Sequence, residues 1–264
     1  MTTITWDAVE QRTYETGVDH GVLYDPFGKA VPWNGLTAIN EKPSGASPTP
    51  VFADNIKWLT LMSPEDLSLT LEAYTYPDEF AVCEGTVELG EGVTVTQQAR
   101  LPFGLSYRTL IGSALKGTKH GYKLHLVYGA LASPSERSYS SLNDSPEINT
   151  MSWDLSTTPV EVPGHDATAH MIIDSTKINR MALAAIETIL YGGPVADGRL
   201  PTPAEIITIL DSDWEELLVV DNGDGTWTAS GPDSIIAMIT DTMFQINSTS
   251  VEILDNGVFQ LSSN

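Results

Sequence analysis

Histidine is the side chain in this sequence best suited to acid–base or metal chemistry. Five histidines are present: His20, His120, His125, His165 and His170. His165 and His170 lie five residues apart, beside Asp166. On a strand, an odd spacing places two side chains on opposite faces, and a zinc site needs three or four ligands. The spacing therefore predicts structural histidines rather than a metal site.

Other candidate motifs also lack the partners that their chemistry requires. Asp221–Gly225 resembles the start of a calcium loop, but Pro232 occupies the position where an EF-hand loop has glutamate. Ser106 lacks the second glycine of a nucleophile elbow. No group near Cys83 would lower the pKa of its thiol, so we expect a buried, structural cysteine. We therefore expect no enzyme activity, no cofactor and no bound metal.

Charge is the strongest signal in the composition. The chain has 13 basic and 35 acidic residues, which gives a formal net charge of −22 at pH 7. Residues 200–264 contain eleven carboxylates and no lysine or arginine, so this segment and residues 1–199 each carry −11. The electric field of so acidic a protein repels phosphate backbones, so we do not expect it to bind nucleic acid. An acidic protein can still let DNA pass without binding it.

The remaining composition is that of an ordinary globular protein. The 264 residues can bury a substantial core, and 41% hydrophobic residues is too high for general disorder. No segment approaches the roughly 20 apolar residues of a membrane span. Residues 1–7 have neither the basic nor the apolar region of a signal peptide. The single cysteine excludes an internal disulfide and fits synthesis in a reducing cytoplasm.

Alternation of apolar and polar residues predicts a mainly β fold. The clearest segments are 67–74, 122–128 and 151–157. In 122–128 we expect Lys123 and His125 on the polar face. Further strands are expected near 19–24, 30–41, 56–62, 93–97, 101–112 and 168–173.

One helix is expected over 176–191, laid on a β-sandwich or barrel. Its apolar residues recur at the spacing of a helix that packs on one side. Asp174-Ser175-Thr176 offers N-cap oxygens, and Gly192-Gly193-Pro194 ends the helix.

The chain divides into a domain over 1–200, a linker or arm over 201–212 and a small acidic domain over 213–264. Glycine and proline are frequent in 192–203, and a short helical turn is expected over 204–210. In the last domain we expect a short helix after Pro232. Strands are expected there near 217–220, 227–229, 243–247, 250–254 and 258–262. The segments 40–54 and 132–147 are predicted to be long loops, which in compact domains are often functional or order against a partner.

Several short blocks within residues 14–200 occur in an informative order. They are Tyr14–Tyr24, Trp33–Leu36, Ala53–Lys57, Glu72–Phe80, Gly121–Gly129, Ala132–Glu136 with Asn143–Pro146, Ser156–Pro163 and Ile173–Lys177. In order and density these blocks resemble the major tail (tail tube) proteins of bacteriophages with long, non-contractile tails. The segment from about residue 213 is similar to the small C-terminal additions that some of these proteins carry.

The resemblance implies a tail-tube-type fold of two packed β-sheets with one flanking helix, assembled as hexameric rings that stack into a tube. Implied partners are other copies of the chain and the tape measure, tail tip and terminator proteins of the virion, with no membrane. DNA would pass through the tube without specific binding, so its wall should not attract phosphates. The loops 40–54 and 132–147 would order against a neighbouring subunit or ring. The acidic C-terminal domain would lie outside the tube and keep tubes from sticking to one another.

Glu72 and Asp154 are our candidates for acidic residues that face the channel. Both lie on the polar faces of alternating strands, together with Lys123 and His125. They would either face the lumen or form ordinary cross-strand pairs.

A second interpretation is a β-sandwich module that binds carbohydrate or a cell surface. Its sugar-stacking platform would come from Trp33, Trp58, Trp153 and Trp227. Tryptophans of this kind are more often core anchors, and we expect that role for them.

Overall fold

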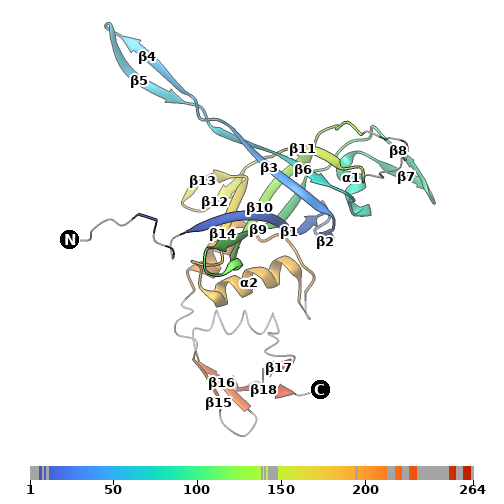
Figure 1. The fold of residues 1–264 in the computed structure, drawn as a ribbon, viewed down its shortest axis with the longest axis vertical. Coiled ribbons are helices and arrows are strands. Elements are labelled where there is room, and N and C mark those ends of the chain that lie inside the picture. The colour runs from blue at the N-terminus through green and yellow to red at the C-terminus, as the bar shows by residue number, and fades with distance from the viewer. Residues whose placement is uncertain are drawn as a thin grey trace. The chain divides into compact units, whose positions relative to one another are not determined.

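The computed structural model describes residues 12–137, 148–193 and 196–212, single positions at 6, 7, 9, 139 and 141, and the backbone of four C-terminal strands. The chain forms two compact units. The first contains residues 1–27, 31–161 and 166–173, and the second contains 28–30, 162–165 and 174–264. The fold is mainly β with short helices (Figure 1), which confirms the predicted fold class.

Eight strands of the first unit join in one hydrogen-bonded sheet. Their order is β2-β1-β9-β10-β11-β6-β3, with β14 beside β10. The strands are β1 (Thr13–Tyr24), β2 (Ala30–Trp33), β3 (Leu36–Gly45), β6 (Glu65–Ala73), β9 (Phe103–Ser113), β10 (Gly117–Ala132), β11 (Met151–Ser156) and β14 (His170–Asp174). The pairings from β1 through β9, β10, β11 and β6 to β3 are all antiparallel.

The long strand β10 folds this sheet into two layers. Residues 117–130 pair with β9, whereas the last two residues of the strand pair with β11. The change of partner follows a bulge at Gly129, whose φ is 57°. A Cβ atom there would lie 2.6 Å from the carbonyl oxygen of Thr158, so only glycine fits.

Apolar side chains from both layers fill a single core. Leu23, Leu105 and Val127 come from β1, β9 and β10, and Leu71 and Trp153 come from β6 and β11. Facing layers with interdigitated side chains define a β-sandwich.

Aromatic rings close one end of this core. Phe80 contacts Trp33, Phe103 and Trp153 with centroids 4.6–5.5 Å apart, in tilted or edge-on arrangements. Phe80 ends the 3-10 turn η2 (Asp78–Phe80), which continues into α1 (Ala81–Glu84). Cys83 on α1 is fully buried, and burial raises the pKa of its thiol to about 12, which confirms a structural cysteine.

The alternation predicted for 67–74 and 151–157 is confirmed, and the alternation predicted for 122–128 is wrong. In β6 and β11 the apolar residues Leu69, Leu71, Trp153 and Leu155 are buried. In β10, however, residues 124–128 are buried on both faces. His125 therefore lies in the protein interior and not on an exposed polar face.

Three small two-stranded sheets complete this part of the fold. One of them is the hairpin of β4 (Pro48–Ala53) and β5 (Ile56–Met62), and β4 lies within a segment that was predicted to be a loop, 40–54. That prediction was wrong, because β3 extends to Gly45 and β4 begins three residues later. The other two sheets pair β7 (Val87–Gly90) with β8 (Val93–Val95), and β12 (Val160–Val162) with β13 (His165–Thr168).

Most predicted strands match observed ones. The prediction 56–62 coincides with β5, and 30–41 is divided into β2 and β3 by a turn. The strands β4, β7, β12 and β13 were not predicted. Of the second long loop, 132–147, residues 133–137 have no helix or strand, and most of the remainder lies outside the described residues.

The second unit contains the two longer helices, α2 (Arg180–Tyr191) and α3 (Pro203–Leu210). Helix α2 starts four residues later than predicted, because Asn179 caps it by accepting a hydrogen bond from the Met181 amide. Asp174 instead accepts hydrogen bonds from the amide and hydroxyl of Thr176 in a preceding turn. Gly192 ends the helix as predicted. Within the described residues no helix is long and apolar enough to cross a membrane.

Four short strands lie in the C-terminal segment. They are β15 (Leu218–Asp221), β16 (Thr226–Ser230), β17 (Ser250–Ile253) and β18 (Val258–Ser262), in the order β15-β16-β18-β17. These four strands were predicted. The helix expected after Pro232 and the strand expected over 243–247 lie outside the described residues.

Candidate functional site

The most unusual feature of the first unit is the β4–β5 hairpin, residues 48–62, which we call the arm. It extends away from the body of the unit (Figure 1). Its turn consists of Asp54 and Asn55, with φ values of 51° and 64°. Positive φ at both central residues is the geometry of a tight two-residue hairpin, and Asp and Asn tolerate it better than most residues.

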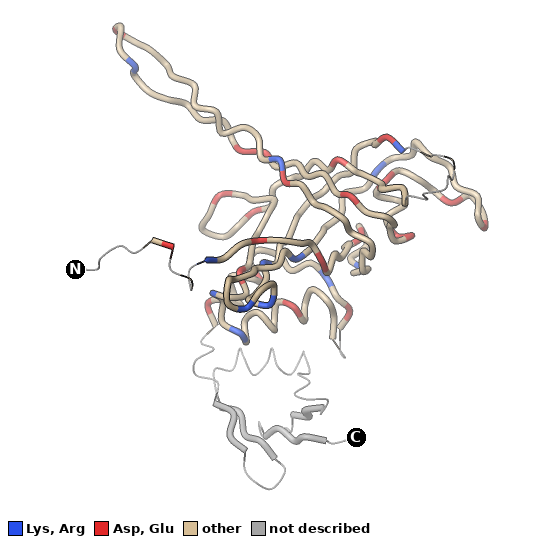
Figure 2. The backbone as a smooth tube through the Cα atoms, in the orientation of Figure 1, with Lys and Arg blue, Asp and Glu red and all other residues tan. Residues whose placement is uncertain are grey.

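The arm is apolar and exposed on both faces. Every residue of β5 is exposed, and successive side chains on a strand point to opposite faces. Phe52 is 66% exposed and Trp58 is 68% exposed. Asp54 and Lys57 are its only charged residues, and Figure 2 shows a nearly uncharged ribbon. A two-stranded ribbon is marginally stable in water, and large exposed apolar patches mark interaction sites.

Trp58 therefore does not fill the core, so the prediction for this residue was wrong. Trp33 and Trp153 are core anchors as predicted, with 2% and 1% of their surfaces exposed. The side chain of Trp227 lies outside the described residues. With two of the four tryptophans buried, the described residues supply no clustered sugar-stacking platform from these positions.

A polar sheet face runs across β3, β6 and β11. It is formed by side chains that alternate with the buried ones: Asn40, Lys42, Ser68, Thr70, Glu72, Ser152, Asp154 and Ser156. Asp154 accepts a 2.6 Å hydrogen bond from Thr70, which is the main cause of its lowered pKa. Lys42 Nζ lies 3.6 Å from the same carboxylate. Asp154 thus forms the cross-strand pair that was one of its two predicted arrangements.

Glu72 lies on the same polar sheet face and is half-buried. The predicted neighbours Lys123 and His125 do not lie on this face. Lys123 forms an ion pair with Glu15 of β1, and His125 is buried. Whether Glu72 and Asp154 face a channel stays a prediction.

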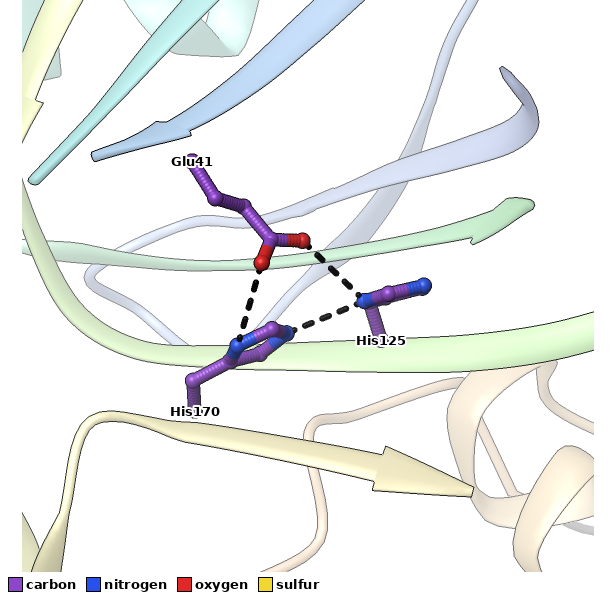
Figure 3. Close-up of side chains that lie close together, drawn as sticks. All are labelled: Glu41, His125 and His170. Atoms are coloured by element: carbon purple, nitrogen blue, oxygen red, sulfur yellow. Dashed lines mark hydrogen bonds and ion pairs between the residues drawn. The ribbon is translucent and has the colours of Figure 1, made fainter. Parts of the chain in front are cut away.

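Sequence reasoning missed a cluster of three side chains, of which one is exposed, one is buried and one is half-buried (Figure 3). Glu41 from β3, His125 from β10 and His170 from β14 converge, although they are widely separated in the chain. His125 Nδ1 lies 3.1 Å from His170 Nε2 and 3.4 Å from Glu41 Oε1. Tyr107 from β9 donates a 2.7 Å hydrogen bond to Glu41 Oε1. No sequence spacing relates these residues, because antiparallel pairing and sandwich closure bring them together.

The cluster contains the ligand types of a metal site, but the two histidines do not present their nitrogens to a common point. Their ring centroids are 5.2 Å apart and the rings are 19° from parallel, while the facing nitrogens are 3.1 Å apart. Both nitrogens therefore lie between the centroids, near the line that joins them. An ion on that line would be half of 3.1 Å from each, whereas a zinc–nitrogen bond needs about 2.0–2.1 Å. The geometry is that of an N–H···N hydrogen bond.

Two further sequence candidates, His165 and Ser106, lie apart from this cluster. His165 is exposed on β13, whereas His170 is half-buried on β14 and contacts His125. Ser106 is fully buried and shares a 3.0 Å hydrogen bond with the hydroxyl of Tyr24.

Comparisons with known proteins leave the family open. The sequence matches no known protein family, and it matches no curated protein. Among solved structures, the chain is similar to one in the sheath–tube complex of an extracellular contractile injection system, PVC, in its extended state. The TM-score is 0.29 with 12% sequence identity, over 59% of this chain and 88% of that one. This overlap does not establish a common fold.

Proposed function

We propose that this chain is a structural subunit of a bacteriophage tail tube, which assembles as hexameric rings that stack into a conduit for DNA. The observation that carries the proposal is the arm. Its apolar side chains are exposed on both faces, so burying them requires covering surfaces on two sides. A stacked ring supplies such surfaces from other copies of the same chain.

The charge of the chain supports a conduit. The tube must let a polyanion slide, and residues 1–199 alone carry −11. The polar sheet face, with Glu72 and Asp154, is our candidate for the lumen wall. Cross-strand pairing of Asp154 with Lys42 lowers the net charge that Asp154 contributes there, so Glu72 is the stronger candidate.

A subunit of the tail tube would also contact other proteins of the virion. The tape measure, tail tip and terminator proteins would contact the tube at its inside and its ends. The acidic segment 213–264 would lie on the outer surface and limit tube-to-tube contact through like charge. The proposal assigns the chain no enzyme activity.

Electron microscopy of the purified protein tests the proposal directly. At high concentration, or when seeded with an assembled tail tip, the chain should form rings and tubes of constant diameter. A protein that stays a monomer under both conditions would refute the assignment.

The role of negative charge on the lumen wall is tested by a charge-reversal variant. Glu72→Lys reverses a charge at our strongest lumen position, and Glu88→Lys on the β7–β8 hairpin is the matched control. Tubes should form in both, and Glu72→Lys alone should slow DNA ejection. Normal ejection by the Glu72→Lys variant would show that charge on this face does not ease DNA passage.

A further inference from the structure

A net charge of −22 opposes contact between copies of this chain, so an assembly needs surfaces where opposite charges meet. Basic side chains are scarce, and four of those in the first unit already form ion pairs with acids of the same chain. They are Lys42, Arg108, Lys123 and Arg137. A surface that carries unpaired basic side chains is therefore the best candidate for contact with another copy.

Three basic residues without such a pair lie together at the turn between β9 and β10. Lys116 lies in the turn and Lys119 near the start of β10. The carbonyl oxygen of Arg12 accepts a 3.0 Å hydrogen bond from the amide of Ala114, which places Arg12 beside the turn. All three basic residues are exposed, and none forms an ion pair with the described residues. Leu115, in the same turn, is 67% exposed. We call Arg12, Leu115, Lys116 and Lys119 the basic turn.

A bulge in β10 enlarges this surface. Three residues of β10, 118–120, lie opposite a single residue of β9, Gly112. Bulges re-aim side chains and are frequent next to functional sites. The extra residues include Lys119, so the bulge adds a positive charge to the basic turn.

The opposite charge lies where the arm joins the sandwich. Glu65 and Asp66 begin β6, are exposed, and form no ion pair with the described residues. Leu61 and Met62, at the end of β5, are 58% and 68% exposed. We call these four residues the arm root. Two carboxylates beside uncovered apolar side chains are the complement of the basic turn, where cations surround Leu115.

The arm is also the part of the first unit that most needs a covering surface. It extends away from the body of the unit (Figure 1), so the cover comes from another molecule and not from its own sandwich. Within the arm, the two charged residues Asp54 and Lys57 lie at or near the turn and have opposite signs. The net charge that orients a partner along the arm therefore lies at the arm root, where it is negative.

We propose that the arm root of one copy docks on the basic turn of another copy. Apolar side chains of the arm root pack on Leu115, and the carboxylates pair with the basic side chains and fix the register. The two surfaces differ, so the contact is heterologous and each added copy offers a free surface to the next. The inference rests on the proposed function, because it names the surfaces through which the copies associate.

Charge reversal in the full chain tests the contact. Lys116→Glu/Lys119→Glu reverses the basic turn, and Glu65→Lys/Asp66→Lys reverses the arm root. Each double variant should raise the protein concentration needed for tube formation by about tenfold or more, because like charges then meet. The variant that combines all four changes brings opposite charges together again and should assemble like the wild type. Wild-type assembly by both double variants, or no recovery in the combined variant, would overturn the proposal.

Matched controls separate this contact from an effect of net charge. Lys177→Glu/Arg180→Glu makes the same change in net charge as the reversed basic turn, at exposed residues of the second unit. Glu88→Lys/Glu91→Lys, at exposed residues of the β7–β8 hairpin, does so for the reversed arm root. Both controls should assemble like the wild type. Defects as large as those of the matching variants would show that net charge governs association and would refute the contact.

Cross-linking detects the contact whether or not tubes form. The single variants Met62→Cys and Leu115→Cys are mixed and mildly oxidised, so that a disulfide between positions 62 and 115 necessarily joins two copies. The native Cys83 is fully buried. Mass spectrometry should find this link in preference to a link between Met62→Cys and Leu89→Cys, the matched control at an exposed apolar residue. The 62–115 link without tubes would support the contact and count against the tube. No preference for that link would overturn the contact, and tubes formed by the same protein would leave the proposed function standing.

Discussion

Trp153 and Trp58 are the same side chain in two opposite situations. Trp153 lies between the two layers of the sandwich, 1% exposed, and its Nε1 donates a 2.9 Å hydrogen bond to Glu84. Trp58 lies on the arm and is 68% exposed. Both belong to antiparallel strands, where Trp153 lies between Ser152 and Asp154 and Trp58 lies between Lys57 and Leu59.

The difference lies in what each strand pairs with. β11 is flanked by β10 and β6 and faces a second layer, whereas β5 pairs only with β4. The apolar side chains of β11 are therefore buried within the subunit. Those of β5 stay uncovered and are available for association with another molecule. The comparison separates residues that stabilise the subunit from residues that we expect to join subunits.

The largest effect on the stability of the subunit is expected for Trp153→Ala. The change removes a fully buried ring that contacts Trp33 and Phe80, and its cavity cannot collapse in a packed aromatic cluster. We expect a loss of about 3–5 kcal/mol in the free energy of unfolding, measured by denaturant titration. A loss below about 1 kcal/mol in the free energy of unfolding would mean that this aromatic cluster contributes little to the stability of the fold.

A smaller loss of stability is expected for Tyr107→Phe, which removes a hydrogen bond from the Glu41 cluster. The ring and its stacking on His125 are retained, but the carboxylate of Glu41 loses its 2.7 Å hydrogen bond. We expect a loss of about 1–2 kcal/mol at neutral pH, since the bond is to a charged group that is partly exposed. Tyr24→Phe, which removes a buried neutral hydroxyl bonded to Ser106, is the control. An equal or larger loss in the control would show that the charge of Glu41 adds nothing.

The sequence predicts where the strands of the sandwich lie better than it predicts which strands pair or pack together. Alternation locates β6 and β11 and their buried faces, because the apolar side chains on one side of each strand meet the core. The same rule fails for β10, where residues 124–128 are buried on both faces of the strand. It also fails for 40–54, where Pro43, Ser47, Pro48 and Pro50 suggested a loop. An isolated ribbon tolerates proline, because its outer edges pair with nothing within the described chain.

The cluster of Glu41, His125 and His170 could not be predicted from spacing. Glu41, His125 and His170 come from three strands whose adjacency depends on β10 changing partner at Gly129. The exposed pair of Asp154 and Lys42 was within reach of sequence reasoning, because cross-strand pairing was one of two stated alternatives for Asp154. Long-range contacts of this kind depend on topology, and a single sequence does not reveal the topology.

Lys42→Ala examines the polar sheet face, where a smaller effect is expected. Lys42 and Asp154 are both more than half exposed, so solvent and salt screen their attraction. We expect a loss of at most about 1 kcal/mol, and less in high salt. Asp154 should keep a lowered pKa, because the hydrogen bond from Thr70 is its main cause. Carboxyl NMR titration and denaturant unfolding measure the two quantities, and a return of this pKa to 3.8 would contradict the assignment.

The smallest effect on subunit stability is expected for Trp58→Ser, which provides the sharpest contrast with Trp153. The ring is mostly in water, so its removal should change the free energy of unfolding by no more than about 0.5 kcal/mol. If the arm joins subunits, the same variant should fail to form tubes at concentrations where the wild type does. The matched control is Leu89→Ser, a 70% exposed apolar residue on the β7–β8 hairpin. Assembly by Trp58→Ser as efficient as that of the wild type would contradict the role of the arm. Equal loss of assembly in both variants would show that general surface hydrophobicity, and not the arm, drives association.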